Sequence, residues 1–95
     1  MYYVYLLKSL KDIKLYTGYT DNLQRRLYEH NKGLVESTKN RRPLELIYYE
    51  WSLNKKDAQT REKYLKSGMG KRYLRNRNKY YLEERVNKAS NSIGT

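Results

Sequence analysis

Few side chains in this 95-residue sequence could perform covalent chemistry, and their types restrict the reaction. The chain has one histidine, His30, and no cysteine, which excludes a thiolate nucleophile and a cysteine-ligated zinc or iron–sulfur site. A Ser-His-Asp triad would have to use His30, but the G-x-S-x-G turn that presents such a serine is absent. The phosphate-binding pattern G-x-x-x-x-G-K-[ST] and a carboxylate cluster for a two-metal centre are absent as well. A site with a single carboxylate stays open, because Mg²⁺ keeps several waters and needs only one or two protein ligands.

The spacing of the remaining polar and aromatic side chains is the second feature. Tyr5 lies in an apolar segment near the N-terminus, and Tyr16 opens the tripeptide Tyr-Thr-Gly in a second one. Arg26 follows Tyr16 by ten residues and His30 follows it by fourteen. Because Arg26 and His30 are four residues apart, they share one side of a helix if that segment is helical.

The charge of the chain points to a polyanionic partner. Lys and Arg number 21 against 10 Asp and Glu, which gives a net charge of +11. A small soluble domain commonly carries a charge of magnitude ~2–8 for solubility alone. From Arg61 to Lys79 there are eight basic residues and one acid, Glu62. Lysine and arginine that neutralise phosphates supply most non-specific affinity for nucleic acid, so we expect nucleic acid as the partner. An anionic membrane is the main alternative, but the basic stretch lacks a wide apolar face.

The length and the N-terminus restrict the class of protein. A chain of this length is expected to form one domain with a modest core. The apolar run Tyr2–Leu7 is too short for a signal-peptide core or a membrane span. We therefore expect a cytoplasmic protein that binds no membrane and no organic cofactor.

The elements that must position these residues can be predicted from the pattern. The continuous apolar run Tyr2–Leu7 predicts a strand that is buried on both faces at the centre of a sheet. Leu15–Thr20 predicts its hairpin partner, and the alternation of Leu44, Leu46 and Tyr48 predicts a third strand, 44–51. Gly18 inside a strand indicates a bulge or a close backbone approach.

Three helices are predicted between and after the strands. Asp21 with Gln24 three residues later resembles a capping box, and Gly33 is a plausible stop for a helix that ends near residue 31. Asn54 is expected to cap a helix over 55–67, the segment 67–70 to break it, and a short helix to follow over 71–79. The order β-β-α-β-α-α favours an α+β fold with a small three-stranded antiparallel sheet over residues 1–82. The polar residues 83–95 are expected to form a disordered tail.

The ordered set of motifs resembles the GIY-YIG nuclease family. Tyr3-Val4-Tyr5 corresponds to the first signature tripeptide, with Tyr3 in place of glycine, and Tyr16-Thr17-Gly18 to the second, with Thr17 in place of Ile or Val. The resemblance covers about residues 2–75, and the closest similarity is to small single-domain bacterial members. Further matching segments are Asp21–Leu27, His30–Gly33, Ser37–Lys39, Arg42–Pro43, Tyr48–Glu50 and Arg61–Lys66.

The resemblance implies an endonuclease that hydrolyses a DNA phosphodiester with Mg²⁺ or Mn²⁺. The implied catalytic residues are Tyr5, Tyr16, Arg26, His30 and Glu62. Tyr16, supported by Tyr5, would orient or deprotonate the attacking water, Arg26 would clamp the phosphate, and Glu62 would be the single metal ligand. His30 would donate to the phosphate or assist proton transfer, and Asn76 and Asn78 are the candidates for a C-terminal asparagine found in some members.

The remaining basic residues are candidates for contacts that position DNA without reading its sequence. Together with Gly18, which would let the substrate approach, this set comprises Lys39, Arg41, Arg42, Lys66, Lys71, Arg72 and Arg75. DNA repair or processing is the expected role, with targeting supplied by DNA shape, a protein partner or a dimer. Two alternatives stay open: a DNA-binding module that keeps the fold without cleaving, and an interaction protein whose basic face meets an acidic protein.

Overall fold

The sheet has the predicted three strands, with the most apolar strand at its centre. The computed structural model describes residues 1–84. Strand β1 (Tyr2–Ser9) lies between β2 (Leu15–Thr20) and β3 (Leu44–Ser52), and both pairings are antiparallel. An unbroken apolar run suits a strand that is covered on both faces, and the prediction for β1 is confirmed.

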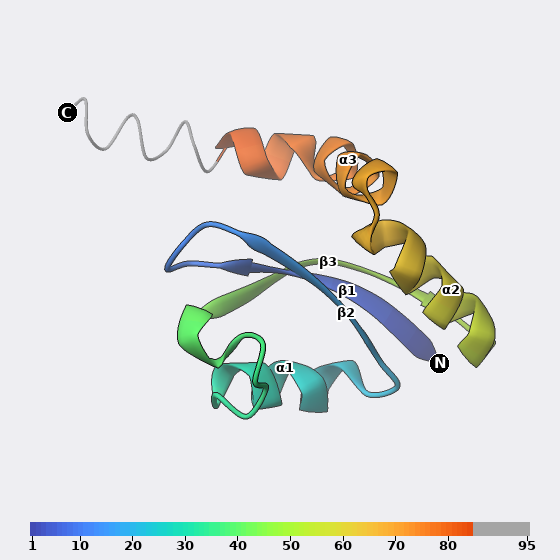
Figure 1. Cartoon of the computed structure of the whole chain (residues 1–95), viewed down its shortest axis with the longest axis horizontal. Coiled ribbons are helices and arrows are strands. Elements are labelled where there is room, and N and C mark those ends of the chain that lie inside the picture. The colour runs from blue at the N-terminus through green and yellow to red at the C-terminus, as the bar shows by residue number, and fades with distance from the viewer. Residues whose placement is uncertain (85–95) are drawn as a thin grey trace.

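The helices cover both faces of this sheet, as Figure 1 shows. Helix α1 (Leu23–Asn31) lies on one face, and α2 (Lys55–Lys66) with α3 (Gly68–Arg77) covers the other. Residues 79–84 continue helically, so the predicted domain end at residue 82 lies inside a helical segment. Most of the predicted tail, 85–95, lies outside the described residues. The fold is α+β in the predicted order, and within residues 1–84 no helix is both long and apolar enough to cross a membrane.

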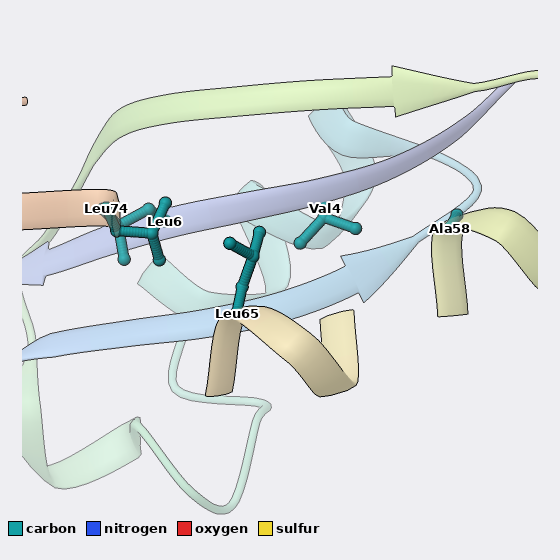
Figure 2. Packing of buried hydrophobic residues seen from close by; sticks show 5 residues of the cluster. All are labelled: Val4, Leu6, Ala58, Leu65 and Leu74. Atoms are coloured by element: carbon teal, nitrogen blue, oxygen red, sulfur yellow. The ribbon is translucent and has the colours of Figure 1, made fainter. Parts of the chain in front are cut away.

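Side chains of β1 alternate between two apolar clusters. Val4 and Leu6 face α2 and α3, where they pack with Ala58, Leu65 and Leu74 (Figure 2). On the other face Tyr5 and Leu7 pack with Leu44 of β3, next to the half-buried Leu23 and Leu27 of α1. The alternation follows from the period of two along a strand, and it places Tyr5 on the α1 face.

A β-bulge in β3 changes the predicted facing of one residue. Leu6 pairs with Tyr48 but Leu7 pairs with Leu46, so the register shifts between them. Leu46 therefore packs on the α1 face and Tyr48 against the cluster of α2 and α3. The alternation of Leu44, Leu46 and Tyr48 predicted the strand, but Tyr48 does not share the face of the two leucines, because an extra residue in one strand reverses the facing beyond it.

Helix α1 begins one residue later than predicted. Asn22, not Asp21, is the N-cap, and its side-chain oxygen accepts a hydrogen bond from the backbone N–H of Arg25 at 3.1 Å. Asp21 instead pairs with the Arg25 guanidinium at 3.3 Å. Both residue types accept hydrogen bonds from a helix N-terminus, so the sequence could not separate them. The predicted stop is confirmed, since Gly33 has φ +76° just after the helix.

The predicted break between the last two helices is a single residue, Ser67. It ends α2, and its Oγ accepts from the N–H of Gly70 at 3.1 Å to cap α3. Helix α3 therefore starts at Gly68 rather than at residue 71. A Cβ on Gly70 would lie 2.0 Å from the Tyr64 carbonyl oxygen, so the glycine allows the backbones of α2 and α3 to touch. Asn54 caps α2 as predicted.

Candidate functional site

Tyr5 lies across β2 because Gly18 has no side chain. The two residues are paired in the register of β1 and β2. A Cβ built on Gly18 would lie 2.4 Å from both Cζ and Oη of Tyr5. The ring is 2% exposed and Gly18 is buried beneath it. The close approach at Gly18 is therefore made by the Tyr5 ring. This ring fills the space that we had expected the DNA substrate to use.

Replacing Gly18 by alanine is expected to destabilise the fold by about 1–3 kcal/mol, the usual cost of overpacking a tight contact. The Tyr5 ring cannot move away without losing its hydrogen bond to His30. Gly68→Ala is the matched control, because nothing lies within 4 Å of the position that its Cβ would take, and this change should leave stability unchanged or raise it. Urea unfolding of both variants measures the difference, and equal midpoints would contradict this role of Gly18.

A buried chain of hydrogen bonds runs from Tyr5 through His30 to Thr38. The Tyr5 hydroxyl lies 2.8 Å from His30 Nε2, and His30 Nδ1 lies 2.7 Å from the Thr38 hydroxyl. His30 and Thr38 are both 0% exposed. Both ring nitrogens of His30 are therefore occupied by protein partners and neither faces solvent. This geometry favours a role in holding Tyr5, while the predicted contact to phosphate stays a prediction.

The arginine on the same side of α1 lies near Tyr5. The pKa of Arg26 is raised, chiefly by the Tyr5 hydroxyl. A neutral histidine has one donor and one acceptor nitrogen, so Tyr5 and Thr38 take opposite hydrogen-bonding roles at the two nitrogens of His30. The predicted pairing of Arg26 and His30 on one side of the helix is confirmed.

Burial makes Tyr5 a weak acid. Loss of water around the hydroxyl raises the pKa of Tyr5 to about 12, and the smaller effect of the Arg26 hydrogen bond opposes this. A phenol with that pKa keeps its proton near neutral pH. Burial likewise lowers the pKa of His30 to about 4, with a further contribution from Arg26. His30 is therefore neutral near pH 7.

Tyr16 is the more accessible tyrosine of the pair. Its ring centroid lies 6.4 Å from that of Tyr5 and 5.3 Å from that of His30. The residue is half-buried on β2, an edge strand of the sheet. The predicted grouping of Tyr5, Tyr16, Arg26 and His30 thus forms one cluster between the sheet and α1.

Glu62 comes from α2, which covers the opposite face. Its side chain is 21% exposed and its Oε2 pairs with Lys66 Nζ at 3.0 Å. It is close enough to Tyr5 for its charge to raise the pKa of that hydroxyl slightly. No group of three or more His, Cys, Asp or Glu that could hold a metal occurs in residues 1–84. One accessible carboxylate still fits Mg²⁺, which takes oxygen ligands and keeps its waters.

The predicted DNA contacts divide into two groups. In the loop before β3, Lys39 pairs with Glu36, Arg41 pairs with Asp12 at 3.2 Å, and Arg42 donates to the Lys39 carbonyl. Arg41 also accepts, through its carbonyl, from the Ser9 hydroxyl, so it joins this loop to the β1–β2 turn. The other four, on α2 and α3, are exposed: Lys66, Lys71, Arg72 and Arg75.

Sequence reasoning included Thr38 in the matching segment Ser37–Lys39 but gave it no role, although it is the partner of His30. The short 3₁₀ helix η1 (Lys39–Arg41) follows it. No local pattern marks a threonine that folds back eight residues onto a histidine. Glu29 was missed as well, although a carboxylate three residues after Arg26 on a helix is a detectable signal: it pairs with Arg26 at 3.2 Å.

Comparisons with known proteins give a consistent family. The model of the family described as "GIY-YIG catalytic domain" matches residues 1–80. A UPF0213 protein of Clostridium perfringens is 49% identical over 67 residues, 70% of this chain and 71% of the relative. A UPF0213 protein of Bacillus pumilus is 39% identical over 84 residues, 87% of this chain and 80% of the relative. A solution NMR structure of a UPF0213 protein from Bacillus halodurans is 35% identical with a TM-score of 0.48, covering 78% of this chain and 82% of that one.

Proposed function

The chain belongs to the GIY-YIG catalytic domain family, a nuclease-type family, and from this premise we propose that it is a divalent-metal-dependent DNA endonuclease. The observation that carries the proposal is the cluster of Tyr5, Tyr16 and Arg26 around a buried His30. Its hydroxyl and guanidinium groups are held in place before any substrate arrives. Preorganised donors are the largest single source of rate enhancement in many enzymes, because they need not reorganise during the reaction.

Arg26 is proposed to bind the scissile phosphate. Its side chain is 36% exposed, and its partner Glu29 holds it from the next turn of α1. The planar guanidinium can contact two phosphate oxygens and stays charged at any working pH. The negative charge that develops on the phosphate in the transition state would be stabilised by this cation.

Tyr16 is proposed to orient the attacking water and, as a phenolate favoured by the nearby Arg26 and the divalent cation, to receive the water's proton. Tyr5 is unsuited to that step, because a pKa of about 12 keeps its proton in place. Tyr5 instead hydrogen-bonds to the buried His30 and packs beside Tyr16, and so would hold the cluster in place next to Arg26. The two tyrosines would thus have unequal roles, with Tyr5 as the support and Tyr16 as the group nearest the water.

Glu62 is proposed to hold the divalent cation. The cation would supply charge neutralisation at the phosphate and help the leaving oxygen depart. Lys66 pairs with Glu62 at 3.0 Å, so this lysine would have to move or to share the carboxylate. That ion pair is also what supports the alternative, a DNA-binding module with the same fold and no cleavage.

The proposed catalytic domain comprises residues 1–82, and we propose DNA repair or processing as its setting. Contacts to DNA would come from the exposed cations on α2 and α3, with Lys39 and Arg42 of the loop as further candidates. One site cuts one strand, so a double-strand cut would need a dimer or two encounters. A protein partner or DNA shape would supply the targeting.

Cleavage of a DNA panel tests the proposal. Labelled nicked, flapped, branched and plain duplex DNA are incubated with Mg²⁺ or with EDTA. We expect cleavage of at least one of these substrates in Mg²⁺, its loss in EDTA, and a decrease of about 10²- to 10³-fold in Arg26→Ala.

Two other outcomes would identify the alternatives. Salt-sensitive DNA binding without cleavage of any substrate would contradict the enzyme and support the binding module. No DNA affinity at moderate salt would support an interaction with an acidic protein instead.

A further inference from the structure

A cavity of about 340 Å³ lies between β2 and the corner of α2 and α3. Its apolar lining comes from Leu6, Leu15 and Leu74, of which Leu6 and Leu74 belong to the core. Its polar lining comes from four cations, Lys14, Lys66, Lys71 and Arg75. Among residues 1–84, no Asp or Glu lines it. The volume is at the lower end of the ~300–1,000 Å³ that small-molecule sites span.

We propose that this cavity binds one unpaired nucleotide of the DNA substrate. An apolar surface suits the face of a base, and the surrounding cations suit the phosphates on either side of it. Among residues 1–84 no carboxylate lines the cavity, although Lys66 pairs with Glu62 outside it, so the cavity is complementary to an anion with a flat apolar part. The inference rests on the proposed function, in that it takes DNA as the ligand, and it names the substrate class: DNA with a nucleotide that is not held in a duplex.

A paired base cannot enter such a cavity. In a duplex both faces of the base are covered by its neighbours, and enzymes that enclose a base first take it out of the stack. The cost of unstacking is least where the base is already unpaired. The cavity would therefore favour flaps, gaps, bulges or single strands over plain duplex.

The cavity adjoins the proposed catalytic residues. Lys66 lines it and also pairs with Glu62 at 3.0 Å. Tyr16 and Thr17 of β2 contribute to its wall, while the Tyr16 ring packs with Tyr5 on the other face of that strand. A DNA strand that passes the β2 edge could place one phosphate at Arg26 and the neighbouring base in the cavity.

An exposed aromatic patch on the α1 face is the competing place for a base. It consists of Tyr3, Tyr49 and Trp51; Tyr49 and Trp51 are 49% and 53% exposed, and Tyr3 packs edge-on against Tyr49 at 6.0 Å. The cavity beside it is lined by Tyr3, Tyr49 and residues 21–24, and no Lys or Arg of the described part of the chain, 1–84, lines it. Within residues 1–84 the patch therefore offers no basic side chain in this cavity to contact the DNA phosphates.

The test measures binding with 2-aminopurine, a fluorescent base whose emission is quenched by stacking. Glu62→Gln protein in EDTA is titrated into two duplexes, one with a single unpaired 2-aminopurine and one with the same base paired. We expect emission to rise on binding of the unpaired base, because aliphatic side chains replace its stacked neighbours. We also expect the unpaired DNA to bind about tenfold more tightly than the paired DNA.

Two matched double variants separate the cavity from general charge. Lys71→Ala/Arg75→Ala removes two cations of the cavity and should abolish the preference for unpaired DNA. Lys32→Ala/Lys79→Ala removes the same charge at exposed sites outside the cavity. It should lower the affinity for both duplexes alike and keep the preference for unpaired DNA. Trp51→Ala should also keep it.

Each contrary result has a distinct meaning. Equal affinity for the two duplexes, or a preference that survives Lys71→Ala/Arg75→Ala, would overturn the cavity as a nucleotide site. Loss of the preference in Trp51→Ala would assign the base to the aromatic patch. Failure of the proposed function is a separate result. If wild-type protein binds unpaired DNA selectively but cleaves nothing in Mg²⁺, the cavity is supported as a nucleotide site and the endonuclease activity is contradicted.

Discussion

Replacement of Glu62 by glutamine is expected to lower Mg²⁺-supported cleavage by about 10²- to 10³-fold. Glutamine keeps the shape of the side chain but removes the negative charge that would attract the cation. The change should cost little stability, because the carboxylate lies partly exposed on α2 and its one ion pair among the described residues is with Lys66. A surface pair of this type contributes only ~0.3–0.5 kcal/mol.

The loss must be assigned to the metal and not to weaker DNA binding. Removing a negative charge should strengthen DNA binding slightly, so affinity in EDTA is measured beside the single-turnover rate. Glu36→Gln is the matched control, because Glu36 pairs with Lys39 at 3.1 Å and is 87% exposed, outside the proposed site. Cleavage by Glu62→Gln at the rate of Glu36→Gln would contradict the role of Glu62.

Stability is expected to fall as the pH drops from 6.5 to 4, by up to about 3 kcal/mol from His30 alone. Its pKa is lowered from 6.5 to about 4 in the folded protein, chiefly by burial and further by the charge of Arg26, while Glu29 opposes. Between these two values the unfolded chain binds a proton that the folded chain does not. Acid therefore favours unfolding in this window, and above pH 6.5 the contribution of His30 is constant.

The physical reason is the hydrogen-bond chain. A protonated His30 would carry an N–H on both ring nitrogens, so neither could accept from Tyr5 or Thr38, and its charge would be buried at 0% exposure. Urea unfolding of wild type and His30→Gln at several pH values measures the effect. Carboxylates titrate in the same range, so the difference between the two proteins isolates the histidine. Parallel stability curves would show that His30 is not buried in its neutral form.

Much of the fold could be predicted because local patterns and tertiary packing agree. The run that became β1 is apolar at every position from Tyr2 to Leu7, and only a central strand buries both faces. Asn54 and Gly33 were identified as helix ends because their roles need only local geometry. A predicted helix start was wrong where two neighbouring residues are nearly equal as N-caps, as Asp21 and Asn22 are at the start of α1.

The grouping of the site residues could be predicted, but their unequal roles could not. The spacing of Tyr5, Tyr16, Arg26 and His30 places them together once the hairpin and α1 form. What the spacing does not contain is the burial of Tyr5 under the space left by Gly18 and the return of Thr38 to His30. These depend on chain segments that meet only in the folded state, and they favour a role for His30 in holding Tyr5.

The most direct test of the account is the origin of the oxygen in the product. The protein cleaves DNA under single-turnover conditions in Mg²⁺ and H₂¹⁸O, and the terminal phosphate is analysed by mass spectrometry. Attack by water predicts one ¹⁸O atom in that phosphate. Cleavage without ¹⁸O, accompanied by a covalent link between DNA and a tyrosine, would make a tyrosine the nucleophile and would contradict hydrolysis assisted by Tyr16.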